Sequence, residues 1–190
     1  QRRLIHLVTD QIYEKEKKQP YDDRDSQSDC RVPKMVKSGL HVLHINILTQ
    51  LLLEKLTRKS ENYVLSWSQQ HMIATASALH DIGKIGIDEK ILNKPGKLTK
   101  EEFEAMKQHT IIGARMLDRL EMYHDEEMMK YAYEICRWHH ERYDGKGYPD
   151  GLKGEEIPIS AQVVSLADVY DALVSDRYIR KHILMRRQWR

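Results

Sequence analysis

Cysteine is scarce in this sequence. The 190 residues contain two, Cys30 and Cys136, which lie far apart and do not form a Cys-x-x-Cys motif. The spacing gives no sign of a disulfide framework or of a paired redox motif. Two free thiols in a reducing, cytoplasmic compartment are therefore expected.

Long apolar runs and an excess of charge are also absent. No run approaches the roughly 20 apolar residues that a membrane-spanning helix needs, and the first residues, Gln-Arg-Arg-Leu, do not resemble a signal peptide. The formal net charge is +2, so nothing points to a nucleic acid polymer or a membrane surface as partner. Because Gln1 is not a natural start, the sequence is expected to be a fragment of a longer chain.

What is present is a pattern of apolar residues at helical spacing, with no convincing strand pattern. It predicts an all-α fold with a sizeable core. The predicted helices cover residues 32–59, 67–83, 99–109, 111–120, about 126–141 and 160–175. Ser66 with Gln69 and Thr99 with Glu102 form predicted capping boxes, and Gly83 is the predicted stop of the helix at 67–83.

Two parts of the chain differ from these helices. Residues 1–31 are predicted to form a charged linker helix followed by a mobile acidic loop, which leaves residues 32–190 as the main domain. Residues 142–151 contain three glycines and a proline, so they form an irregular loop. A long ordered loop in a compact domain tends to be functional.

Ionisable residues interrupt the apolar helices at several points. Any one of these histidines, taken alone, is more often a surface residue or a hydrogen-bonded core residue than a ligand. Taken together, imidazoles and carboxylates from four or more helices are typical of dinuclear metal sites in helical bundles, and mixed His/Asp ligation suits iron, manganese or zinc. The candidates are His41, His80, Asp81, His109, His139, His140 and Asp168.

Several motifs occur in a recognisable order. They are His-Asp-Ile-Gly-Lys at 80–84, Met-Lys-Gln-His at 106–109, His-His-Glu-Arg-Tyr-Asp-Gly-Lys-Gly-Tyr-Pro at 139–149 and Ala-Asp-Val-Tyr-Asp-Ala-Leu at 167–173. Between about residues 39 and 180 the chain resembles the HD-GYP subfamily of HD-domain metal-dependent phosphohydrolases. The resemblance implies a bacterial signalling enzyme that hydrolyses cyclic di-GMP to linear pGpG and in some cases GMP.

The resemblance also implies a set of site residues. His41, His80, Asp81 and Asp168 would hold one divalent metal, iron or manganese by preference, and Asp81 would bridge to a second held by His109, His139 and His140. Asp81 and Lys84 would be the catalytic residues. Substrate phosphate would be contacted by Lys84, Arg177, Arg180 and Lys181, and the loop beside the site would be shaped by Gly147, Tyr148 and Pro149.

Expected partners are cyclic di-GMP, an upstream receiver or sensor domain, a diguanylate cyclase and a second copy of the chain. Two departures from the family pattern matter. Lys37 stands where many members have a glutamate ligand, which favours two metals rather than three. His44 stands where arginine is common, and it is expected to support the ligands from behind or to lie in the outer pocket rather than to be a ligand itself. The chain also stops soon after Arg180, so it is either truncated or unusual at this end.

Two alternatives remain open. One is an HD-type phosphohydrolase that acts on another nucleotide, including the hybrid cyclic GMP-AMP. The other is a weakly active domain that binds a cyclic dinucleotide or a diguanylate cyclase and signals by its shape.

Overall fold

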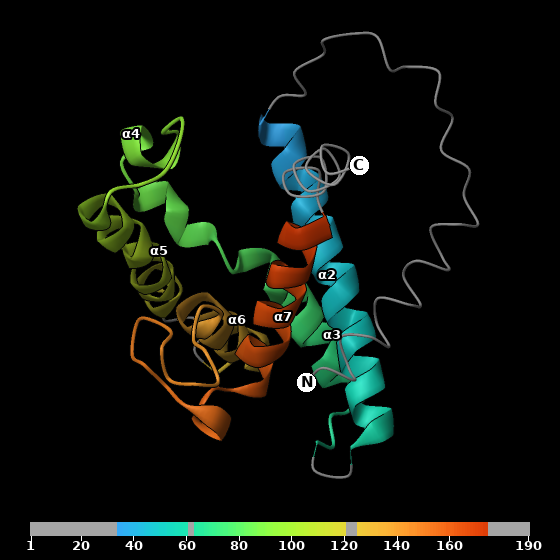
Figure 1. Ribbon diagram of the computed structural model, residues 1–190. Helices are drawn as coiled ribbons and strands as arrows, with labels where there is room; N and C mark the ends of the chain where they lie inside the picture. The colour runs from blue at the N-terminus through green and yellow to red at the C-terminus, as the bar shows by residue number, and fades with distance from the viewer. Residues whose placement is uncertain (1–33, 61–62, 121–124, 175–190) are drawn as a thin grey trace, which may run out of the picture. The chain divides into compact units, whose positions relative to one another are not determined.

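The computed structural model describes residues 34–60, 63–120 and 125–174 (Figure 1). The described residues from Ser38 onward belong to one compact unit. The predicted linker helix and acidic loop of residues 1–31 lie outside the described residues.

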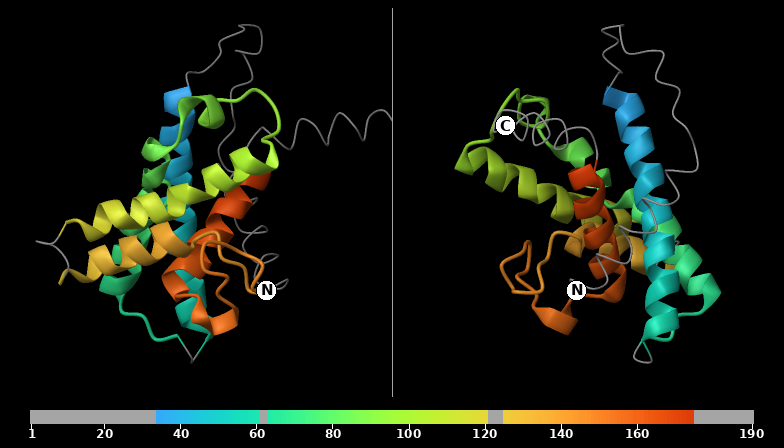
Figure 2. Two further views of the ribbon diagram at one scale, coloured as in Figure 1. Left: turned by 90° about the vertical axis from the view of Figure 1, so that its left-hand side faces the viewer. Right: turned by 45° about the vertical axis from the view of Figure 1, so that its right-hand side comes forward.

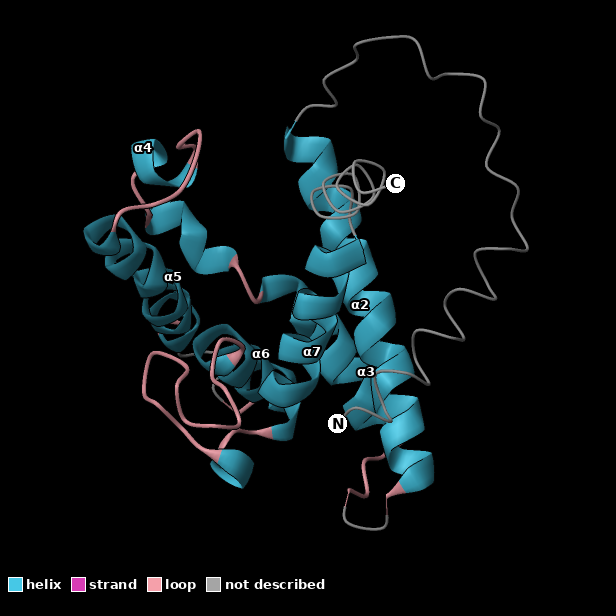
Figure 3. Cartoon of the chain, in the orientation of Figure 1, coloured by secondary structure: helices cyan, strands magenta, loops and turns pink. Residues whose placement is uncertain are grey.

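The described residues are helical and contain no named strand, which confirms the all-α prediction (Figure 3). The α-helices are α2 (Lys34–Lys59), α3 (Trp67–Ala76), α4 (Glu89–Leu92), α5 (Lys100–Asp118), α6 (Glu127–Trp138) and α7 (Ile159–Val174). In the part of the chain that the structure describes, they are joined by the short 3-10 helices η2 (Ser77–Leu79), η3 (Ile82–Gly86) and η5 (Gly154–Glu156). None of the described helices is long and apolar enough to cross a membrane.

Both predicted capping boxes are present. The Ser66 hydroxyl accepts a hydrogen bond from the backbone of Gln69 at the start of α3, and Thr99 accepts one from Glu102 at the start of α5. In each box the side chain at the third helical position bonds back to the cap residue, so two otherwise unpaired backbone donors are satisfied. These caps fix where the two helices begin.

The structure corrects the prediction that one helix runs from residue 67 to a stop at Gly83. The α-helix ends at Ala76 and continues as η2 and η3, and Gly83 does not have a positive φ. Glycine is needed there for another reason. A Cβ on Gly83 would lie 1.9 Å from the carbonyl oxygen of His109 and 2.5 Å from the backbone nitrogen of Gly113. This side-chain-free contact lets η3 approach the middle of α5.

Helix α5 is also continuous where the sequence predicted two segments. Thr110 lies at the predicted break, but its hydroxyl donates to the carbonyl of Lys107 and its side chain is fully buried. Gly113, further along the helix, provides the space for η3 and for the thiol of Cys136. The break that the sequence predicted between residues 109 and 111 is therefore absent. This part of α5 is instead the face on which η3 and Cys136 pack.

Helix α6 lies in the middle of the domain, packed against α3, α5 and α7 (Figure 2). Its buried residues Ala132, Ile135 and Cys136 have no exposed surface. Helix α2 is joined to α3 by a hydrogen bond of 2.6 Å from the side-chain amide of Asn46 to the carbonyl of Ala74. The candidate ligands are carried by these elements or by the turns that follow them.

Candidate metal centre

Each candidate ligand comes from a well-defined place in the fold. His80 and Asp81 lie in the tight turn between η2 and η3, and His109 lies in the middle of α5. His139 and His140 directly follow the last residue of α6. His41 lies on α2 and Asp168 on α7. The bundle thus brings together residues that are more than a hundred positions apart.

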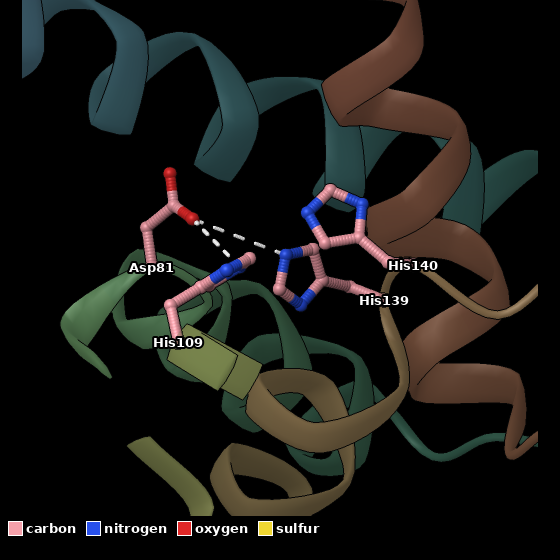
Figure 4. Close-up of side chains that lie close together, drawn as sticks. All are labelled: Asp81, His109, His139 and His140. Atoms are coloured by element: carbon pink, nitrogen blue, oxygen red, sulfur yellow. Dashed lines mark ion pairs between the residues drawn. The ribbon is translucent and has the colours of Figure 1, made fainter. Parts of the chain in front are cut away.

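The first group of candidates surrounds one oxygen of Asp81. Its Oδ1 lies 3.5 Å from Nε2 of His109 and 4.0 Å from Nε2 of His139 (Figure 4). Asp81, His109, His139 and His140 each offer a ligand atom, and these atoms lie within 4.8 Å of one another. Such a group has the size and the donors of a transition-metal site.

The second group lies on the other oxygen of Asp81. Its Oδ2 is 3.3 Å from Nε2 of His80, and ligand atoms of His41, His80 and Asp81 lie within 4.8 Å of one another. Asp168 borders this group through His41, with 3.5 Å between its Oδ1 and the histidine's Nε2. The two oxygens of Asp81 therefore face two separate sets of imidazoles.

Three imidazoles are oriented by their own backbone. Nδ1 of His80 bonds to the carbonyl of Ser77 at 2.8 Å, that of His109 to Met106 at 2.7 Å, and that of His139 to Ile135 at 2.9 Å. A carbonyl can only accept, so each Nδ1 carries the proton and each Nε2 presents a lone pair. This tautomer leaves Nε2 of each imidazole able to bind a metal ion.

These Nε2 atoms are buried and have no hydrogen-bond partner. The same holds for Oδ1 of Asp81. Leaving a buried polar atom unsatisfied costs about 1–3 kcal/mol. The donor set therefore fits a metal ion, because a cation beside Oδ1 of Asp81 would satisfy that oxygen and the Nε2 atoms of His109 and His139, while Nε2 of His80 offers a further donor on the Oδ2 side.

The electrostatics of the two groups differ. Burial lowers the pKa of His109, and burial together with neighbouring histidines lowers those of His139 and His140, the last to about 3. Burial alone would also lower the pKa of His80, but the carboxylates of Asp81 and Asp168 outweigh it and raise that pKa. Three imidazoles are thus held neutral, while His80 holds a proton more readily.

Asp81 is held as a carboxylate. Burial opposes its ionisation, but His80 and the ammonium of Lys84 outweigh burial and keep the pKa of Asp81 well below its usual range. Lys84 Nζ lies 2.5 Å from Oδ2 of Asp81, and its side chain is 39% exposed. Lys84 therefore stands at the rim of the centre, partly exposed and paired with Asp81.

The loop after α6 is fixed against this centre. The ring of Tyr148 lies 4.8 Å from that of His140, and the Tyr148–Pro149 peptide bond is cis. A Cβ on Gly147 would lie 2.3 Å from the backbone nitrogen of Arg142 and 2.4 Å from Cα of Glu141. Tyr148 thus lies beside one candidate ligand, and the absence of a side chain at Gly147 lets the loop pass close to the backbone that follows His140.

Some predicted residues cannot be placed. Arg177, Arg180 and Lys181 lie outside the described residues, as does the side chain of Lys37. His44 is placed: its Nδ1 lies 2.9 Å from Oδ1 of Asp171, and its side chain is 52% exposed.

Two residues that support the candidate ligands or the loop were not predicted as site residues. Asp171, 7% exposed, contacts both His41 and His44. Glu141, 3% exposed, accepts hydrogen bonds from the backbone nitrogens of Asp150 and Gly151 at 2.7 and 2.9 Å and so holds the loop. The available signals were the three-residue spacing from Asp168 to Asp171 and the position of Glu141 next to His139-His140.

Comparison with known proteins identifies the family to which the chain is similar. The family model described as HD domain matches residues 36–188. A cyclic di-GMP phosphodiesterase of Thermotoga maritima is 56% identical over 105 residues, which are 55% of this chain and 27% of that protein. A probable cyclic di-GMP phosphodiesterase of Vibrio cholerae is 41% identical over 148 residues, 76% of this chain and 34% of its own length.

The name of a third relative gives a different specificity. The 3'3'-cGAMP-specific phosphodiesterase 2 of Vibrio cholerae is 39% identical over 141 residues, covering 74% of this chain and 25% of that protein. The chain therefore spans about a quarter to a third of the length of these three relatives.

Proposed function

This chain belongs to the HD domain family, and on that premise we propose that it hydrolyses a phosphodiester bond of cyclic di-GMP to give linear pGpG and, by a second cleavage, GMP. The proposal is supported by relatives that are named as a cyclic di-GMP phosphodiesterase and a probable one. The observation that carries it is the convergence of buried, unpartnered Nε2 atoms on the unpartnered oxygen of Asp81.

We propose two divalent metal ions at this centre. His41, His80, Asp81 and Asp168 would hold one, and Asp81, His109, His139 and His140 would hold the other. Iron and manganese are the preferred metals, because imidazole and carboxylate donors suit them. Two such ions supply Lewis-acid stabilisation of phosphoryl oxygens and lower the pKa of water.

The chain's own residues orient and neutralise the substrate. Asp81, ionised and contacted on both oxygens, sets the separation of the two groups of imidazoles. Lys84 is exposed enough to place its ammonium against a non-bridging phosphate oxygen, where charge accumulates during hydrolysis. Arg177, Arg180 and Lys181 remain proposed further phosphate contacts, and Tyr148 with its neighbours Gly147 and Pro149 shapes the wall beside His140.

The test is product analysis. Purified protein is incubated anaerobically with Fe²⁺ or Mn²⁺ and cyclic di-GMP, and products are separated by chromatography and identified by mass. We expect linear pGpG, with or without GMP. Absence of both products with either metal would contradict the proposal.

A second candidate substrate is the hybrid cyclic GMP-AMP, because a relative of similar identity is specific for it by name. Equal concentrations of the two cyclic dinucleotides and of simple nucleotides, assayed side by side, separate the cases. Tight binding of cyclic di-GMP without product would instead support the signalling-domain alternative. An upstream receiver or sensor domain, a diguanylate cyclase partner, a homodimer and a cytoplasmic location remain predictions.

A further inference from the structure

Asp171 makes an unusual pair of contacts across two helices. Its Oδ2 lies 2.6 Å from Nδ1 of His41, and its Oδ1 lies 2.9 Å from Nδ1 of His44. The two histidines are three residues apart on α2, so they share one side of that helix. Their two imidazoles converge on a single carboxylate of α7 that is 7% exposed.

This contact gives His41 a different support from the other candidate ligands. Nδ1 of His80, His109 and His139 bonds to a backbone carbonyl three or four residues earlier in the chain. Nδ1 of His41 instead meets a side chain from another helix. The orientation of His41 therefore depends on a group that a single substitution removes.

The geometry also selects the tautomer of His41. An ionised carboxylate only accepts hydrogen bonds, so Nδ1 of His41 carries the proton and donates a hydrogen bond to Asp171. Nε2 of His41 then presents a lone pair. That Nε2 lies on the side of Asp168, 3.5 Å from its Oδ1. A carboxylate on the far nitrogen of a ligating histidine fixes the ring and raises its basicity, and loss of such a partner typically weakens metal binding 10- to 100-fold.

We propose that Asp171 is a positioning residue for the metal position formed by His41, His80, Asp81 and Asp168, and that His44 acts on this position through Asp171. The inference rests on the metal centre of the proposed function. His44 donates to the second oxygen of the carboxylate and so keeps the carboxylate turned toward α2. The position formed by His109, His139 and His140 with Asp81 does not share this support, because His109 and His139 are held by their own helices.

The test is a titration of metal-free protein with Mn²⁺. Binding is measured by calorimetry and by the electron paramagnetic resonance signal of free Mn²⁺. In Asp171→Asn the amide offers one acceptor oxygen, so one of the two imidazoles loses its partner. We expect wild type to bind two equivalents. The variant should bind one equivalent with unchanged affinity and the other about 10- to 100-fold more weakly.

His44→Ala provides the second arm. This substitution should weaken binding of the same metal ion by a smaller factor, because His41 keeps its hydrogen bond to Asp171. If His44 acts through Asp171, the double variant should bind no more weakly than Asp171→Asn alone. Asp125→Asn, the same chemical change at an exposed aspartate ahead of α6, is the matched control and should bind as wild type does.

Three results would overturn the inference: an unchanged affinity for both equivalents in Asp171→Asn, an equal weakening of both, or additive effects of the two substitutions. Binding of a single equivalent by wild type would overturn it as well. Thermal unfolding of the metal-free variants identifies a general loss of structure, which also contradicts a local role. The metal titration contains no nucleotide, so its outcome does not depend on turnover. A wild-type protein that hydrolyses no cyclic dinucleotide would contradict the proposed function, and the metal affinities would still test the role of Asp171.

Discussion

Replacing Gly83 by alanine tests how closely η3 must approach α5. The new Cβ would lie 1.9 Å from the carbonyl oxygen of His109, 2.8 Å from its carbonyl carbon and 2.5 Å from the backbone nitrogen of Gly113. All three atoms belong to the backbone of a helix, so no side-chain rotation can relieve the contact. The helix and the 3-10 turn must separate.

The magnitude follows from two opposing effects. Overpacking a well-packed interior costs about 1–3 kcal/mol, and rigid neighbours favour the upper end. Alanine recovers about 0.5–1 kcal/mol, because it loses less backbone freedom on folding than glycine does. The net loss is then about 2 kcal/mol, which for a domain of this size lowers the melting temperature by about 4–8 °C.

Gly39→Ala is the matched control. Gly39 lies inside α2, and a Cβ there would meet nothing within 4 Å. The same substitution should therefore stabilise the protein by about 0.5–1 kcal/mol. Thermal unfolding of both metal-free variants, followed by circular dichroism, measures the difference. A melting temperature of Gly83→Ala equal to or above that of wild type would refute the reasoning.

Three further predictions concern the centre itself and the adjoining loop. Asp81→Asn removes the charge that both groups of imidazoles share, so turnover of cyclic di-GMP should be abolished; near-normal turnover would overturn the assignment. Acidification should release the metal ion beside His80 before the one beside His109, His139 and His140. The pKa of His80 is raised, so protons compete with the metal there at higher pH, whereas the pKa values of the other three histidines are lowered. Dialysis of Mn²⁺-loaded protein at stepped pH measures this, and simultaneous release would contradict it. Glu141→Ala leaves two backbone donors without their acceptor and should cost about 2–3 kcal/mol in chemical denaturation, with Glu141→Gln closer to wild type.

Local signals in the sequence were sufficient for much of the fold. The capping boxes at Ser66 and Thr99 involve residues three apart, and both occur as predicted. The irregular loop was predictable because its glycines and its proline cannot continue a helix. Helical spacing likewise located α2 and α7 to within about two residues.

Features that depend on contacts between distant segments were not predictable. The role of Gly83 comes from the approach of α5, which no local pattern describes. Asp171 is one of two aspartates on α7, and only the packing of α2 against it shows that it meets His41 and His44. The candidate ligands were named through a resemblance and a joint pattern, while their tautomers required the backbone contacts of the folded chain.

Anomalous diffraction from crystals of the manganese-loaded protein would show whether two metal ions share the Asp81 carboxylate. We expect two peaks on either side of that carboxylate, one beside His109, His139 and His140 and the other beside His41, His80 and Asp168. A single peak, or peaks that lie away from Asp81, would contradict this expectation.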